Sequence, residues 1–104
     1  MNQKVIRYRT KPEKTEENRR LIEAVFLELK DKAPAGLRYA TLALEDGGFV
    51  HIVDYEEGAP KLTTFDAFDR FQSDVEERCA ELPQVAEARI VGNYRMFEEP
   101  GDAR

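Results

Sequence analysis

The chain has 104 residues and a net charge of about −5, which suits a single domain with one core. No basic stripe interleaved with aromatic residues occurs along this acidic chain, so nucleic acid is not an expected partner. Cys79 is the only cysteine, which excludes an intramolecular disulfide and a thiolate metal cluster.

The two ends of the chain carry little patterning. The N-terminal segment MNQKVIRYRTK lacks the apolar run of a signal peptide, and no apolar stretch approaches the ~20 residues of a membrane span. We therefore expect a cytoplasmic protein with no membrane partner. Residues 1–97 are predicted to form the domain, and residues 98–104 (EEPGDAR) a polar tail.

The predicted elements follow the order strand, helix, hairpin, helix, strand. Their ranges are 4–9 (strand), 15–32 (helix), 37–44 and 49–55 (hairpin strands), 64–80 (helix) and 85–96 (strand). This order predicts an α+β, ferredoxin-like βαββαβ fold, in which two helices cover one face of a four-stranded antiparallel sheet.

Each predicted helix has an apolar face at helical spacing. In the first helix this face consists of Leu21, Ile22, Val25, Phe26 and Leu29. In the second helix it consists of Phe65, Phe68, Phe71, Val75, Cys79 and Leu82. We expect the aromatic residues of the second helix to be core residues.

The hairpin turn at Glu45-Asp46-Gly47-Gly48 allows two registers. A two-residue Asp46-Gly47 turn mixes polar and apolar side chains on both faces of the hairpin. A three-residue loop with left-handed Gly47 instead makes one face uniformly apolar. That face contains Ala40, Leu42, Leu44, Val50 and Ile52. We favour the second register and expect this face to pack against the helices.

The same alternation assigns the remaining strand residues. Ile6 and Tyr8 are expected to point toward the helices. The opposite face then carries Arg7, Tyr39, Thr41, His51, Val53, Glu87, Arg89 and Val91. This mixture of polar, aromatic and β-branched residues is compatible with plain exposure, since antiparallel sheets can face water on one side. It also suits an interface that encloses a polar cavity.

The chain resembles the dimeric α+β barrel superfamily, and within it the antibiotic biosynthesis monooxygenase-like group. The resemblance rests on the element order, on the first strand running through Arg7-Tyr8-Arg9-Thr10-Lys11-Pro12-Glu13-Lys14 into an acidic helix start, and on the ending Asn93-Tyr94-Arg95-Met96-Phe97. It implies a homodimer with its two sheets face to face, and a pocket between sheet and helices or within the barrel. Members of this superfamily include cofactor-independent quinol monooxygenases, haem-degrading enzymes and isomerases.

Two features differ from the patterns of those enzymes. The chain contains no tryptophan, whereas several oxygenases of the group use an Asn, Trp and His set. Its only histidine lies on the predicted third strand, whereas haem-degrading members place theirs on the second helix. We therefore transfer no catalytic residue from the family, and haem degradation is not expected.

The candidate catalytic residues are His51, Tyr39, Arg7 and Arg89. His51 is the natural proton carrier near neutral pH. Tyr39 and the two arginines could stabilise an enolate or phenolate through charge-assisted hydrogen bonds. No metal-ligand spacing occurs, and no cofactor is expected.

Two functional classes remain open. One is a small cofactor-independent enzyme that transfers a proton, with or without O₂, on an aromatic or enolisable compound. The other is a dimeric module that binds a small molecule or only assembles. A closed cavity lined by His51 and Tyr39 would favour the enzyme.

Overall fold

The computed structural model describes residues 2–97, so the predicted tail lies outside the described residues. Its main elements are the strand β1 (Asn2–Thr10), the helix α1 (Thr15–Lys32), the strands β2 (Leu37–Ala43) and β3 (Gly48–Tyr55), the helices α2 (Asp66–Ser73) and α3 (Val75–Arg78), and the strand β4 (Cys79–Arg89). Two 3₁₀ turns, η1 (Pro12–Lys14) and η2 (Leu62–Thr64), precede α1 and α2.

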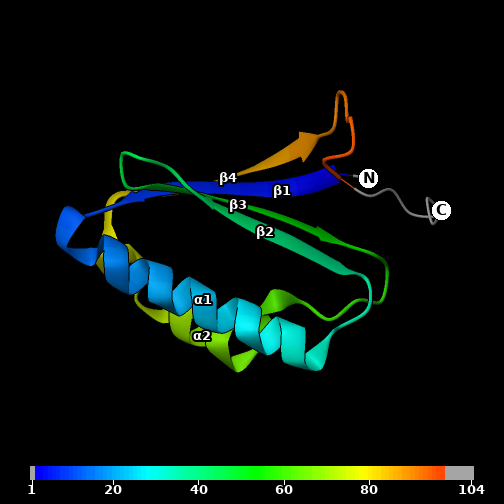
Figure 1. The fold of residues 1–104 in the computed structure, drawn as a ribbon, viewed down its shortest axis with the longest axis horizontal. Helices are drawn as coiled ribbons and strands as arrows, with labels where there is room; N and C mark the ends of the chain where they lie inside the picture. The colour runs from blue at the N-terminus through cyan, green and yellow to red at the C-terminus, as the bar shows by residue number, and fades with distance from the viewer. Residues whose placement is uncertain (1, 98–104) are drawn as a thin grey trace.

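The four strands form one antiparallel sheet in the order β2-β3-β1-β4, and the helices lie together on one of its faces (Figure 1). This confirms the predicted ferredoxin-like α+β fold. Within residues 2–97, no helix is both long and apolar enough to cross a membrane.

The hairpin has the favoured three-residue register. Ala40 lies opposite Ile52, Thr41 opposite His51 and Leu42 opposite Val50. Gly47 makes the left-handed turn with φ +86°, a conformation that side chains disfavour. The local turn chemistry therefore sets which residues are paired across the hairpin.

The predicted orientation of the hairpin is wrong. Leu42 is 52% exposed on the face away from the helices, whereas His51 is only 3% exposed on the helix side. His51 lies opposite Ile6 of β1, and directly opposite residues in a sheet share a face. Ile6 and Tyr8 do point toward the helices as predicted. His51, Tyr39 and Val53 lie on the same face of the sheet.

The predicted second helix is also too long. Helical structure ends at Arg78, and β4 begins at Cys79, opposite Thr10 of β1. Pairing with β1 satisfies backbone groups that a continued helix would leave without partners, including the Lys11 amide, which donates to the Arg78 carbonyl at 2.9 Å. Leu82, predicted on the buried helical stripe, is an exposed strand residue.

The last strand ends at Arg89 rather than at residue 96. Beyond it, the Asn93 side chain accepts hydrogen bonds from the Met96 and Phe97 amides, which makes a compact turn. Val91 and Tyr94 are highly exposed there. This stretch is therefore a surface segment beside the sheet.

The core lies between the sheet and the helices. Its buried cluster consists of Tyr8, Ile22, Val25, Phe49, Ala67, Phe71 and Cys79. Of the predicted aromatic stripe, Phe71 and Phe65 are buried, while Phe68 is partly buried. Phe68 packs against the ring of Tyr39, and Phe71 against the ring of His51. The prediction that the helix aromatics contact the face with Leu42 and Ile52 is wrong.

Candidate functional site

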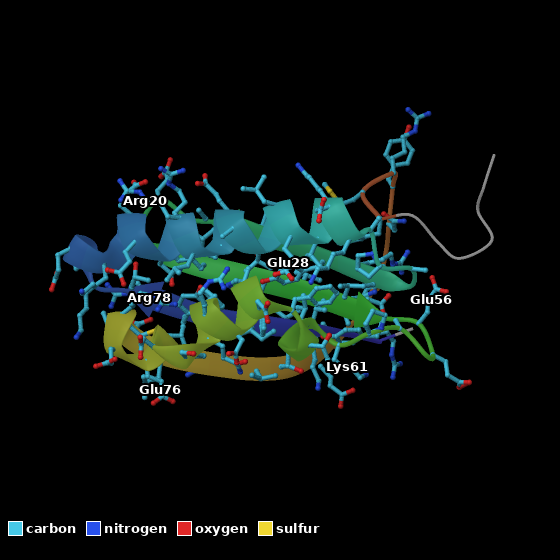
Figure 2. The ribbon with its side chains drawn as sticks, turned by 90° about the horizontal axis from the view of Figure 1, so that it is seen from below. Arg20, Glu28, Glu56, Lys61, Glu76 and Arg78 are labelled. Carbon is cyan, nitrogen blue, oxygen red and sulfur yellow. The ribbon has the colours of Figure 1, made fainter. Side chains whose placement is uncertain are left out.

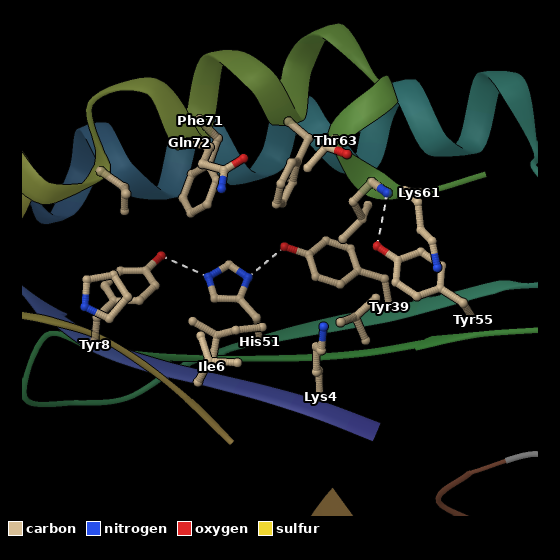
Figure 3. Close-up of a pocket in the computed structure, with 16 residues that line it drawn as sticks. Lys4, Ile6, Tyr8, Tyr39, His51, Tyr55, Lys61, Thr63, Phe71 and Gln72 are labelled. Atoms are coloured by element: carbon tan, nitrogen blue, oxygen red, sulfur yellow. Dashed lines mark hydrogen bonds between the residues drawn. The ribbon is translucent and has the colours of Figure 1, made fainter. Parts of the chain in front are cut away.

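A pocket of about 470 Å³ lies between the helix-facing side of the sheet and α2 (Figure 3). Its volume is within the range of small-molecule sites, ~300–1,000 Å³. Apolar side chains form most of its wall, with three tyrosines, His51 and two lysines among them. The lining is Lys4, Ile6, Tyr8, Tyr39, His51, Val53, Tyr55, Lys61, Leu62, Thr63, Phe68, Phe71, Gln72, Val75, Pro83 and Val85.

His51 lies in the middle of this wall with both ring nitrogens hydrogen-bonded. Its Nε2 is 2.8 Å from the Tyr8 hydroxyl. Its Nδ1 is 2.6 Å from the Tyr39 hydroxyl and 3.0 Å from the Thr41 hydroxyl. Figure 3 shows the two tyrosines on either side of the imidazole. Three strands therefore contribute one continuous set of hydrogen bonds.

The set continues away from the pocket into the core. Asn18 of α1, which is fully buried, donates from Nδ2 to the Tyr8 hydroxyl at 2.9 Å. Its Oδ1 accepts from Arg78 Nε at 2.9 Å. Arg78 is 2% exposed, lies between α1 and the α2–α3 segment (Figure 2), and donates from Nη2 to the Phe71 carbonyl. A buried cation thus stands at the inner end of the chain of hydrogen bonds.

The directions of these hydrogen bonds follow from Arg78. Because a guanidinium only donates, the Asn18 oxygen must face it, and the Asn18 amide group must donate to Tyr8. The Tyr8 proton then has His51 Nε2 as its acceptor. His51 consequently carries its proton on Nδ1 and donates it toward Tyr39 and Thr41. The Tyr39 hydroxyl is also hydrogen-bonded to Thr41, so its proton can be donated either to the Thr41 hydroxyl or to a molecule in the pocket.

Burial shifts the pKa values of this set toward the neutral forms. It lowers the pKa of His51 to about 4 and raises the pKa of Tyr39 to about 12. It also raises the pKa of Tyr8 well above its usual range, although the hydrogen bond from Asn18 acts in the opposite direction. At neutral pH the site therefore presents an uncharged imidazole and protonated tyrosines.

The fold that forms this pocket can be compared with known proteins. No family model matches the chain, and no curated protein matches it. Solved structures do match. One is Rv0793 from Mycobacterium tuberculosis, with 15% identity, a TM-score of 0.68, and coverage of 88% of this chain and 96% of that one. Another is a protein from Bacteroides thetaiotaomicron with a provisional assignment as an antibiotic biosynthesis monooxygenase. Its TM-score is 0.72 at 14% identity, and the match covers 93% of this chain and 96% of that one.

A third match is a structure described as an antibiotic biosynthesis monooxygenase, with 15% identity and a TM-score of 0.66. It covers 88% of this chain and all of that one. The chain has the antibiotic biosynthesis monooxygenase-like fold. At these identities the likeness concerns the fold, which confirms the resemblance inferred from the sequence at that level.

The four candidate residues do not gather at one place. His51 and Tyr39 line the pocket and are hydrogen-bonded to each other. Arg7 is exposed on the opposite face of the sheet, opposite Val50 and Gln84. Arg89 is exposed at the end of β4, opposite Asn2. Neither arginine lines the pocket, so the neutral state of His51 arises from burial and not from neighbouring guanidinium groups.

Sequence reasoning missed Asn18 and Arg78. Asn18 precedes Ile22 and Val25 by four and seven residues, which puts it on the apolar face of α1. A polar residue at such a position is a signal of a buried hydrogen bond. Arg78 follows Phe71 by seven residues, but the helix ends there, so the spacing alone gave no reliable signal. Among residues 2–97, no cluster of three His, Cys, Asp or Glu side chains could hold a metal ion.

Proposed function

We propose that this protein is a small cofactor-independent enzyme that stabilises the anion of an aromatic or enolisable compound. The observation that carries this proposal is the Tyr39 hydroxyl, which lies 2.6 Å from His51 Nδ1 on the wall of an apolar pocket, where it can donate its own proton to a ligand. Two of the structurally similar proteins are described, one of them provisionally, as antibiotic biosynthesis monooxygenases, which supports an enzyme of this kind.

The chemistry of the proposed step is a proton transfer. A ligand carbonyl or hydroxyl oxygen accepts the Tyr39 hydrogen bond. The ligand loses a C–H or O–H proton to solvent. The electron pair of the broken bond stays on the ligand, which becomes an enolate or a phenolate. A donor held in a desolvated site stabilises this developing charge more than water does. The anion then either regains a proton at carbon, or forms a C–O bond with O₂ and takes up a proton from solvent to give a hydroperoxide.

His51 acts in this proposal mainly through Tyr39. Both of its nitrogens are already hydrogen-bonded, and its lowered pKa makes it a weak base. It fixes the orientation of the Tyr39 hydroxyl, and the buried charge of Arg78 polarises the hydrogen-bonded chain behind it. Arg7 and Arg89 have no part in this step.

The test measures both fates of the anion. Oxygen uptake is followed with a panel of quinols and polyketide-like phenols, and deuterium incorporation is followed by NMR with the enolisable ketone 2-tetralone. Tyr39→Phe removes one hydroxyl and should lower kcat about 10²- to 10³-fold, the usual effect of losing one oxyanion donor. Tyr94→Phe is the matched control, because Tyr94 is exposed and does not line the pocket.

Turnover that is equal in the wild type and in Tyr39→Phe would contradict the assigned role of this hydroxyl. The absence of both oxygen uptake and deuterium exchange across the panel would contradict the enzymatic proposal itself.

The second candidate is a module that binds a small molecule without turnover. The specific observation in its favour is that every polar group of His51 has a protein partner, which is typical of a structural histidine. Saturable binding of panel compounds with no chemical change would support this module.

We also propose a homodimer that pairs the sheet faces opposite the helices. This face carries the partly or largely exposed apolar side chains Val5, Ala40, Leu42, Val50, Ile52 and Ala86, with Val91 and Tyr94 exposed beside it. A specific interface should bury more than ~1,000 Å². Sedimentation at micromolar concentration should give a dimer of the 12.0 kDa chain, and Leu42→Asp should shift it toward monomer. A wild type that sediments only as a monomer would refute this.

A further inference from the structure

The charged side chains that line the pocket are both positive. They are Lys4 of β1 and Lys61, which precedes η2, and no aspartate or glutamate from the described residues joins them. This contrasts with the chain as a whole, whose net charge is −5. Figure 3 shows Lys61 beside Tyr55 at the end of the pocket away from Tyr8. Lys4 lies opposite Val53, which in turn lies opposite Tyr39, whereas His51 lies opposite Ile6. Both lysines therefore lie on the Tyr55 side of His51, with Lys4 in the same cross-strand row as Tyr39.

The two ammonium groups are not engaged by carboxylates. The ion pairs within 4.0 Å among residues 2–97 include neither Lys4 nor Lys61. Lys61 Nζ lies over the Tyr55 ring, 4.3 Å from its centroid, which restricts its position near the pocket. Glu87 lies opposite Lys4 on the neighbouring strand and lines an adjacent hollow with both lysines and Asp54, but neither carboxylate lines the pocket.

Lys4 and Lys61 are exposed, so water and salt screen their charges, but an ammonium group at the edge of an apolar cavity still favours an anion over a neutral group of the same shape. The long lysine side chains also let their alkyl portions line apolar surface while the charge reaches the ligand. The Tyr39 hydroxyl, beside His51, offers a donor to oxygen. One ligand must satisfy the two ammonium groups, the Tyr39 hydroxyl and the apolar wall.

We infer that the pocket binds a hydroxylated aromatic carboxylate. Its carboxylate lies at Lys4 and Lys61, its ring system lies against Phe68 and Val53, and its hydroxyl or carbonyl oxygen meets Tyr39. The inference rests on the proposed function for the role of Tyr39, and it adds the charge of the substrate and the direction in which it binds.

Binding is tested with four naphthalene probes that differ at one end each. They are 6-hydroxy-2-naphthoate, its carboxamide, 2-naphthoate and 2-naphthol. Because the chain contains no tryptophan, naphthalene fluorescence reports binding with little protein background, and calorimetry supplies an independent dissociation constant. We expect the hydroxynaphthoate to bind at least ~10-fold more tightly than its carboxamide at low ionic strength, with the preference shrinking as salt is added.

Three lysine variants identify the source of the preference. Lys4→Met and Lys61→Met should each reduce the carboxylate-over-carboxamide ratio several-fold, and the double variant should bring it near one. Lys30→Met is the matched control, because Lys30 is an exposed lysine of α1 that does not line the pocket. Glu87→Gln should raise the ratio, since it removes a negative charge from the hollow next to both lysines.

Equal affinity for the carboxylate and the carboxamide would overturn the inference, as would a preference that the Lys4 and Lys61 variants leave intact or that Lys30→Met removes equally. Failure of all four probes to bind at millimolar concentration would also overturn it. These outcomes are separate from the failure of the proposed function: the charge preference is an equilibrium measurement, so it can hold in a protein that shows no turnover.

Discussion

Because His51 is buried, we expect the stability of the protein to depend on pH through this one residue. Burial lowers its pKa from 6.5 to about 4 in the folded protein, whereas the unfolded chain should keep the ordinary value. Between these values the unfolded state binds more protons than the folded state, so stability falls as the pH is lowered. The contribution is complete above about pH 6.5 and is lost progressively toward pH 4.

The linkage relation gives the magnitude. Lowering the pH from about 7 to about 5 should reduce the free energy of unfolding by about 2 kcal/mol through His51 alone. This loss is a substantial share of the free energy of unfolding of a small domain, which is typically about 5–15 kcal/mol.

The assay is urea unfolding of the wild type and of His51→Gln at both pH values, at one fixed protein concentration. His51 is the only histidine, so the variant removes the one side chain with an ordinary pKa between these pH values. The carboxylates titrate in both proteins and cancel in the comparison. The wild type should lose about 2 kcal/mol more than the variant over this interval. Parallel losses in the two proteins would refute the burial argument, as would an imidazole NMR signal that titrates near pH 6.5.

Three further predictions concern stability. Asn18→Leu should lower the free energy of unfolding by about 3 kcal/mol, because it leaves the buried Arg78 Nε without its acceptor and the Tyr8 hydroxyl without its donor; thermal and urea unfolding would measure this, and a loss below ~1 kcal/mol would contradict it. Phe71→Ala should cost about 3–5 kcal/mol by the same measurement, and clearly more than Phe68→Ala, since Phe71 is buried while Phe68 is partly exposed at the pocket. Gly47→Ala should cost about 1–2 kcal/mol through its positive φ alone, because a Cβ there would meet only ordinary contacts; unchanged stability would show that the turn can relax.

Local chemistry in the sequence was enough for much of the fold. The apolar spacing and the Ala33-Pro34 stop gave the bounds of α1 as residues 15–32, which the structure confirms. The left-handed turn at Gly47 gave the register of the hairpin. These features depend on residues that are close together in the chain, so they can be read without knowing the rest of the molecule.

Which face of the hairpin meets the helices could not be read in this way. Both faces carry apolar residues, and the choice depends on how β3 pairs with β1, which places His51 opposite Ile6. The uniformly apolar face, including Leu42, turned outward. The more polar face turned inward because its hydroxyls and imidazole satisfy one another there.

The site itself was decided by contacts between residues far apart in the sequence. Tyr8 and His51 are 43 positions apart, and Asn18 and Arg78 are 60 positions apart. The sequence identified His51 and Tyr39 as groups capable of proton chemistry, because few other residue types can do it near neutral pH. Only the tertiary structure joined them to a buried arginine and to a pocket, because a hydrogen-bonded chain across three strands and two helices exists only after those elements have packed.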